Sequence, residues 1–344
     1  MKRREFLRYM GSLLPYYLLP DYEKNQNNEV TICGAGDVTL GGAFPYMFEK
    51  VKKENGEDKA FKAPFEKVCK YFCDSDINIV NLEGALTNSN KIRPKKFNFK
   101  GDPKYAKCLN EGNIPIVNLA NNHIMDFYEE GALDTICTLN DCNIKYCGAG
   151  KNIEDASTPR FLERNNVKVG FLGYAWVGAD YPAKKASAGT NQINKEKIKN
   201  EVRDAKDNCN VLVVSTHWGD ERESYPNSIQ KDFGKLIIDS GADIIFAHHP
   251  HVLQGIEKYN NGIIFYSLGN FAFGGNTFPS DRDSMIAKVK CTKNGVNNFE
   301  VVPIITHPQC GIYQPFVPSD GERIIDKLKE RSKSLLNEEI KMLI

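Results

Sequence analysis

The sequence has almost no net charge. Its 344 residues include 45 lysines and arginines and 44 aspartates and glutamates, which gives a formal net charge of +1 at pH 7. Proteins that bind nucleic acid usually present a strongly electropositive face. The balanced charge therefore argues against nucleic acid as a partner, and an anionic ligand would have to meet a local cationic patch.

The sequence also lacks the cysteine spacing of structural zinc sites. It has 10 cysteines but no paired CxxC motifs. It shows no internal repeat and no low-complexity linker. Hydrophobic residues make up 41% of the chain and charged residues 26%, a globular composition. A chain of this length can form one large domain or two ordinary ones with a full hydrophobic core.

No hydrophobic run is long enough to span a bilayer, which needs about 20 residues. The apolar stretch at residues 9–20 is interrupted by Pro15, and no Ala-x-Ala cleavage site follows. It comes after "MKRREFLR", which resembles a twin-arginine export signal. We expect residues 1–25 to be an export signal or an anchor that places the protein in the cell envelope, at the outer face of the cytoplasmic membrane. The alternative is a basic amphipathic segment that touches a membrane surface or has no membrane role.

Short β-branched runs alternate with helical patterns along the rest of the chain, which predicts an α/β domain over residues 26–318 and a C-terminal helical segment at 319–344. From residue 252 to 306 the pattern is all strand and begins with a hairpin at Asn260, which indicates a second, more antiparallel sheet. The predicted strands are 29–36, 77–83, 114–119, 167–174, 210–215 and 243–247, and the predicted helices are 61–73, 102–112, 129–142, 195–207, 228–240 and 320–342.

Polar residues able to bind a metal follow five of these strands. The carboxyl ends of strands in an open α/β sheet gather at one crevice, so we expect these segments to converge. Each segment alone is weak evidence, because a Gly-Asp pair is usually a turn and Asn-Asn-His could cap a helix. The residues are Asp37, Asn81 and Glu83, then Asn121, Asn122, His123 and Asp126, then Thr216, His217, Asp220 and Glu221, and finally His248, His249 and His251.

The stretch "HHPH" holds three of the chain's six histidines. Neutral imidazole is the commonest metal ligand. Pro250 favours an extended conformation at His249, which would put His249 and His251 on one face and His248 on the other. We expect His249 and His251 to be ligands and His248 to support them or to face the substrate. Mixed carboxylate, amide and imidazole ligands favour Mn²⁺, Zn²⁺ or Fe²⁺ over Ca²⁺.

Seven motifs in order resemble the CapA-type capsule-synthesis family, which is associated with poly-γ-glutamate capsules. They are "GAGDVTLGG", "VNLEGALT", "FNFKGDP", "NLANNHIMD", "THWGDE", "AHHPHVLQ" and "YSLGNF", and they span roughly residues 30–275. The family has the calcineurin-like metallophosphoesterase fold. The resemblance implies a four-layer αββα sandwich of two mixed sheets flanked by helices.

The resemblance also implies roles for individual residues. Asp37 matches the first aspartate of the family's site, and Glu83 stands where a bridging carboxylate would be. Position 39 is a threonine where metallophosphoesterases have histidine, so one metal loses a ligand. We expect one firm metal site and a weaker second one. The first would use Asn122, His217, His249 and perhaps Glu83, and the second Asp37, Glu83 and His251.

A hydrolytic mechanism would use His123 as the substrate-facing acid, held by Asp126, although Asp126 could instead cap a helix. The basic segment at 91–103 could hold an anionic substrate through Arg93, Lys95 and Lys96, or it could be an ordinary solvated loop. Asn270 could line the site.

Two functions remain open from the sequence. One is a metal-dependent hydrolase or transferase that acts on a phosphate ester or on an anionic polymer. The other is a non-catalytic, membrane-associated partner that binds and exports nascent poly-γ-glutamate. Either could belong to a membrane-bound capsule synthesis complex.

Overall fold

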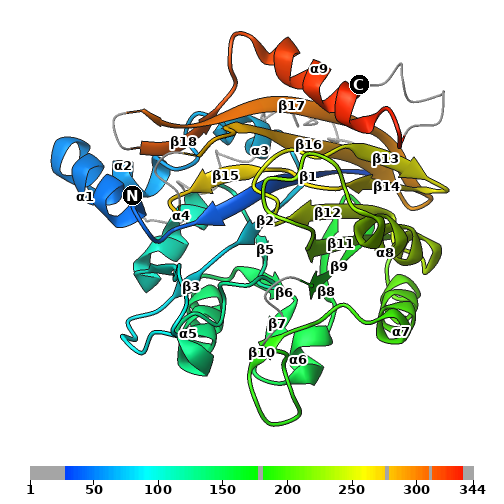
Figure 1. Cartoon of the computed structure of the whole chain (residues 1–344), viewed down its shortest axis with the longest axis horizontal. Coiled ribbons are helices and arrows are strands. Elements are labelled where there is room, and N and C mark those ends of the chain that lie inside the picture. The colour runs from blue at the N-terminus through cyan, green and yellow to red at the C-terminus, as the bar shows by residue number, and fades with distance from the viewer. Residues whose placement is uncertain (1–27, 177–180, 276–278, 310–311, 336–344) are drawn as a thin grey trace, which may run out of the picture.

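The computed structural model describes residues 28–176, 181–275, 279–309 and 312–335, which form two large mixed sheets packed face to face (Figure 1). In the first sheet, β1, β2, β5 and β6 are parallel neighbours, β16 to β18 add antiparallel strands, and β15 pairs with β1 in parallel. Its order is β18 (Ile312–Phe316), β17 (Gly295–Gln309), β16 (Asp283–Thr292), β1 (Glu29–Thr39), β2 (Ile77–Leu82), β5 (Ile116–Asn118) and β6 (Lys145–Cys147), with β15 (Asn270–Phe273) beside β1.

The second sheet has four parallel strands at its centre and an antiparallel strand at each edge. Two short strand pairs, β3 (Ala85–Leu86) with β4 (Lys100–Gly101) and β7 (Ala149–Gly150) with β10 (Gly189–Thr190), lie outside both sheets. The order of the second sheet is β13 (Ile256–Tyr259), β14 (Gly262–Phe265), β12 (Ile244–His248), β11 (Val211–His217), β9 (Val167–Ala175) and β8 (Arg160–Arg164).

Helices cover the outer face of each sheet, and three apolar cores separate the four layers. Successive residues of β1 show the division, because Ile32 packs between the sheets while Cys33 packs against the helices of the first sheet. This confirms the predicted αββα architecture. The helices over the first sheet are α1 (Phe44–Asn55), α2 (Glu57–Lys62), α3 (Cys69–Cys73), α4 (Ala106–Glu111, after the 3-10 turn Pro103–Tyr105) and α5 (Tyr128–Asp141); α7 (Lys195–Lys206) and α8 (Ser228–Asp239) cover the second, and α6 (Ile153–Ser157) lies against β7.

Two predictions about secondary structure are wrong. The helix predicted at 61–73 is divided into α2 and α3, because Pro64 lacks the backbone N–H that would continue the helical hydrogen bonds. The strands between 252 and 306 do not form a sheet of their own. The hairpin β13–β14 extends the second sheet, whereas β15, β16 and β17 join the first.

The helix predicted near the C-terminus is present as α9 (Gly321–Ser332). It packs on β17 and β13, with Ile324 and Leu328 buried in the core between the sheets. The predicted N-terminal signal or anchor and residues 336–344 lie outside the described residues. Within the described residues, no helix has the length and apolar character needed to cross a membrane.

Candidate metal centre

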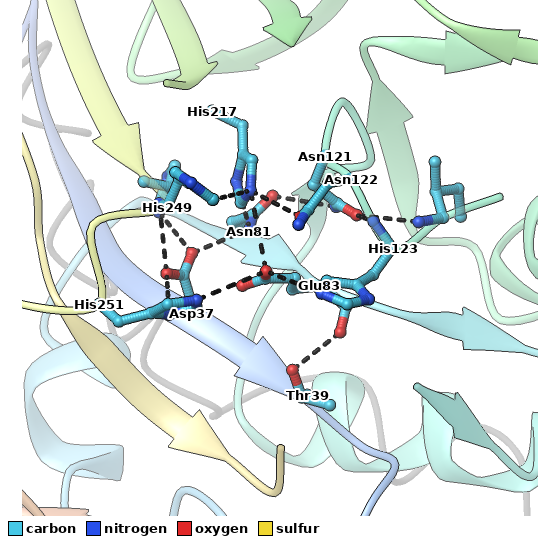
Figure 2. A network of polar contacts seen from close by, with 12 residues as sticks. Asp37, Thr39, Asn81, Glu83, Asn121, Asn122, His123, His217, His249 and His251 are labelled. Atoms are coloured by element: carbon cyan, nitrogen blue, oxygen red, sulfur yellow. Dashed lines mark hydrogen bonds and ion pairs between the residues drawn. The ribbon is translucent and has the colours of Figure 1, made fainter. Parts of the chain in front are cut away.

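The predicted polar segments meet where the carboxyl ends of the parallel strands of the two sheets face each other (Figure 2). Asp37 lies near the end of β1, Glu83 follows β2, and His217 ends β11. The loops after β5 and β12 supply most of the remaining side chains, which are Asn122, His123, His248, His249 and His251.

Glu83 lies at the centre of this cluster. Its Oε1 atom is 3.7 Å from His217 Nε2 and 3.9 Å from His251 Nε2. The residue is fully buried, and neither carboxylate oxygen has a hydrogen-bond partner. Burial, together with the charge of Asp37, raises the pKa of Glu83 well above its ordinary value. A buried carboxylate with free lone pairs among imidazoles fits a divalent cation.

The first predicted ligand set converges around His217. Its Nε2 atom is 2.9 Å from Asn122 Oδ1 and 3.1 Å from His249 Nδ1. Burial, reinforced by the neighbouring His249, lowers the pKa of His217 well below its ordinary value. Burial and the nearby His251 lower the pKa of His249 to about 3. Both rings are therefore neutral at pH 7, the form in which imidazole binds a metal.

The second predicted set converges on Asp37. His251 Nδ1 is 3.4 Å from Asp37 Oδ2 and 2.9 Å from Asn270 Oδ1. Burial would lower the pKa of His251, but Glu83 and Asp37 raise it to about 9. Burial would raise the pKa of Asp37, but contacts with His248 and His251 hold it well below its ordinary value. In the metal-free site these two residues therefore form an ion pair.

The two sets form one continuous cluster. The groups of donor atoms that lie within 4.8 Å of one another are Glu83 with His249 and His251, and Asp37 with Glu83 and His217. Glu83 belongs to both groups, the place expected of a bridging ligand. The nitrogen and oxygen donors fit Mn²⁺, Zn²⁺ or Fe²⁺, and the geometry does not select among them.

The predicted orientation of the histidine loop is wrong. His249 has a φ of +95° and His251 a φ of +58°, so the loop is not extended. It wraps around Asp37, whose Oδ2 atom is 3.4 Å from the backbone N of His249. As a result, His248 also turns towards Asp37, with Nδ1 3.2 Å from Oδ1, and it is 1% exposed. This placement favours support of Asp37 over direct contact with a substrate.

Thr39, which stands where metallophosphoesterases have a histidine ligand, makes a hydrogen bond within the protein instead. Its hydroxyl donates a 2.8 Å hydrogen bond to the backbone carbonyl of Glu83. Asn81 acts as a second support, because its Nδ2 donates to Asp37 Oδ1 at 2.9 Å and its Oδ1 accepts from Asn118 and Asn121. These bonds fix the carboxylates of neighbouring strands, a role that the sequence did not reveal.

His123 and Asp126 form a tight pair beside the cluster. His123 Nδ1 is 2.7 Å from Asp126 Oδ2, and Asp126 also accepts from Lys95 Nζ and the backbone N of Phe99, each at 2.7 Å. Asp126 does not cap α5, whose N-cap is Phe127, so the alternative of a helix cap is wrong. Burial lowers the pKa of His123, an effect that Asp126 opposes.

A cavity of about 430 Å³ opens onto this site. Its wall includes His123, His251 and Asn270, so it reaches both the predicted acid and one of the predicted metal ligands. Asn270 approaches because β15 passes against Gly36, where a Cβ atom would lie 1.9 Å from the carbonyl oxygen of Gly269. Phe99 lies against His123 in a tilted arrangement, with 4.3 Å between the ring centroids.

The three predicted substrate-binding cations do not line this cavity. Arg93 donates to the carbonyl of Met125 and stacks on Tyr181, with 3.7 Å to the ring centroid. Lys95 is bound to Asp126, and Lys96 lies exposed over Phe97. Arg93 and Lys95 thus shape the loop beside His123. Arg222 and Phe99 do line the cavity, although the sequence did not mark them as site residues.

Comparison with known proteins identifies the family. Residues 31–275 match the bacterial capsule synthesis protein family PGA_cap. The chain belongs to this family. A family member of Bacillus subtilis strain 168, "PGA biosynthesis protein CapA", is 35% identical over 276 residues, which cover 79% of this chain and 70% of that protein. "Capsule biosynthesis protein CapA" of Bacillus anthracis is 32% identical over 323 residues, covering 90% of this chain and 76% of its own length.

Among solved structures, this PGA_cap chain is similar to a 5′-nucleotidase precursor from Thermus thermophilus. The TM-score is 0.49 and the sequence identity 12%, with 89% of this chain and 59% of that chain covered.

Proposed function

We propose that the protein is a metal-dependent hydrolase or transferase that acts on a phosphate ester or on an amide of an anionic polymer during capsule synthesis. The observation that carries this proposal is the buried carboxylate and imidazole cluster beside the His123–Asp126 pair, at the end of an open cavity. The names of the Bacillus relatives support poly-γ-glutamate as the polymer.

The residues present fit a divalent cation, because Glu83 is buried with two unpartnered oxygens beside the neutral imidazole of His217. Asp37, Glu83, Asn122, His217, His249 and His251 would hold it. A cation held there would polarise a phosphoryl or acyl oxygen and lower the pKa of a water molecule.

His123 would transfer the proton to the leaving group. Its Nδ1 atom donates to Asp126, which orients the ring and leaves Nε2 directed at the site, 3.8 Å from Glu83 Oε1. Phe99 packs against the ring, with 4.3 Å between the ring centroids. Burial favours neutral imidazole, so a protonated His123 would give up its proton readily.

The expected cell-envelope location is also part of this proposal. The "MKRREFLR" start of the sequence supports export or anchoring at the outer face of the cytoplasmic membrane. There the protein would work with a membrane-bound capsule synthesis complex.

A second function, binding and export of the polymer without catalysis, is favoured by one observation. Thr39 stands where a histidine ligand would complete a two-metal site, and its hydroxyl is already bound to the Glu83 carbonyl. With one ligand fewer, the cation would serve to hold the strand ends together.

Catalytic turnover by the purified protein distinguishes an enzyme from a non-catalytic binding partner. We would measure hydrolysis of a chromogenic phosphodiester and the shortening of poly-γ-glutamate, each with Mn²⁺, for the wild type and His249→Ala. Glu154→Gln is the control, because Glu154 is an exposed carboxylate in the first turn of α6 and does not line the cavity. Metal-dependent turnover that His249→Ala abolishes and Glu154→Gln retains is expected. A metal-loaded wild type that binds the polymer but turns over neither substrate would support the second function.

A further inference from the structure

A second cavity continues from the first. It has a volume of about 560 Å³ and shares part of its wall, including Arg222, Val252 and Asp281, with the cavity at the metal centre. A ligand that extends beyond the metal centre would therefore enter it. Its outer wall is formed by Arg282 and by α9.

The charged wall of this second cavity consists of four cationic side chains and two carboxylates, a net charge of +2. The two carboxylates are already neutralised by α9. Arg323 binds Asp283 through two 2.7 Å hydrogen bonds, and Lys327 contacts both Asp283 and Asp281.

The remaining two cations, Arg222 and Arg282, have no side-chain hydrogen bond or ion pair with any residue that the structure describes. Arg93 and Lys95 differ from them, because hydrogen bonds to Met125 and Asp126 occupy donors of their side chains. The excess positive charge of the cavity thus lies on two guanidinium groups that are free to bind an anion.

The backbone of Arg222 is hydrogen-bonded to the loop that carries His249 and His251. Its backbone N–H donates a 2.8 Å hydrogen bond to the carbonyl of Pro250, which lies between His249 and His251. Its φ of +67° is in the left-handed region, which is unfavourable for a residue other than glycine. The loop therefore holds Arg222 where the two cavities join.

We propose that the second cavity is a subsite for a neighbouring carboxylate of a polycarboxylate chain, bound by Arg222 and Arg282. A planar guanidinium group binds a carboxylate through two parallel hydrogen bonds, which gives both strength and orientation. One repeat of the chain would lie at the metal centre while the next places its carboxylate between the two arginines. The identity of the chain as poly-γ-glutamate rests on the proposed function.

The test is equilibrium binding of a fluorescein-labelled γ-glutamyl decamer to the full chain, followed by anisotropy with and without Mn²⁺. The variants are Arg222→Gln and Arg282→Gln, which keep the side chain polar and similar in shape. Arg203→Gln is the matched control, because Arg203 is an exposed arginine on α7 with no ion pair or hydrogen bond from its side chain within the described residues. Unlabelled inorganic polyphosphate serves as a competitor with a different anionic group.

We expect each cavity variant to weaken decamer binding about tenfold and the control to change it less than about twofold. Equal weakening in Arg203→Gln, unchanged binding in both cavity variants, or competition by polyphosphate as effective as that by the decamer would overturn the proposal. Failure here is distinguishable from failure of the proposed function. A protein that hydrolyses the chromogenic ester but shows no arginine-dependent binding refutes only the subsite, and the reverse result refutes only the enzyme.

Discussion

At the scale of single residues, the site is defined by one buried carboxyl group that makes no hydrogen bond within the described residues. Glu83 is buried with both oxygens unpartnered, while the backbone carbonyl of the same residue is held by Thr39. Asp37 in contrast pairs with His251, and Asn81 donates to it. The carboxylate at position 83 is therefore the one that most needs a cation.

Glu83→Gln tests this directly. The folded, metal-free state keeps a proton on Glu83 that the unfolded chain releases above the ordinary value of 4.5, so the wild type loses stability as pH rises above that value. Glutamine has no such proton. We would measure the free energy of unfolding of Glu83→Gln and of the wild type with a chelator present. We expect the difference in favour of the variant to grow by about 1.4 kcal/mol per pH unit above 4.5, until the folded-state pKa of Glu83 is reached. A constant difference between pH 5 and pH 8 would show that Glu83 titrates normally.

Asp126→Asn tests the proton-transfer pair. We expect kcat for the chromogenic ester to fall by about 100-fold while bound metal is unchanged. Because Asp126 raises the pKa of His123 against the effect of burial, its loss should also move the His123 limb of the pH–rate profile to lower pH. A purely structural role would lower activity without moving that limb, and this outcome would argue against the pair.

At the scale of elements, strands were more predictable than helices. The residues that end β1, β2, β5, β11 and β12 could be brought together from the sequence alone, because parallel strands place their carboxyl ends at one edge. The helix α1 was missed, although Phe44, Met47, Phe48 and Val51 show a helical period and Pro45 suits its first turn. The histidine loop was mispredicted because its contacts with Asp37 override the preference that Pro250 imposes on His249.

The packing of α9 gives a prediction at this scale. Leu328 is fully buried between the sheets, whereas Lys329 on the same helix is exposed. We expect Leu328→Ala to reduce the free energy of unfolding by about 2–5 kcal/mol and Lys329→Ala to change it by less than about 0.5 kcal/mol, as measured by urea denaturation. Similar small effects of both substitutions would mean that α9 does not contribute to the folded core.

At the scale of the whole molecule, the fold and the donor cluster could be predicted from the sequence, but the cationic cavity beside the cluster could not. The cationic segment at 91–103 was the evident candidate for substrate binding, yet Arg93 and Lys95 are used within the protein. The free cations, Arg222 and Arg282, are 60 residues apart in the sequence. They line one cavity only because the loop after β11 and the loop between β15 and β16 converge there. Such a patch leaves no local signature in the chain.

The metal content of the purified protein shows whether the strand ends form a metal centre. Elemental analysis would be carried out on the full chain after expression with Mn²⁺, Zn²⁺ and Fe²⁺ available, beside His217→Ala, His249→Ala and the control Glu154→Gln. We predict at least one equivalent of transition metal per chain in the wild type and the control, and its loss in both histidine variants. A folded wild type that contains no metal, or histidine variants that keep it, would show that the strand ends do not form a metal centre.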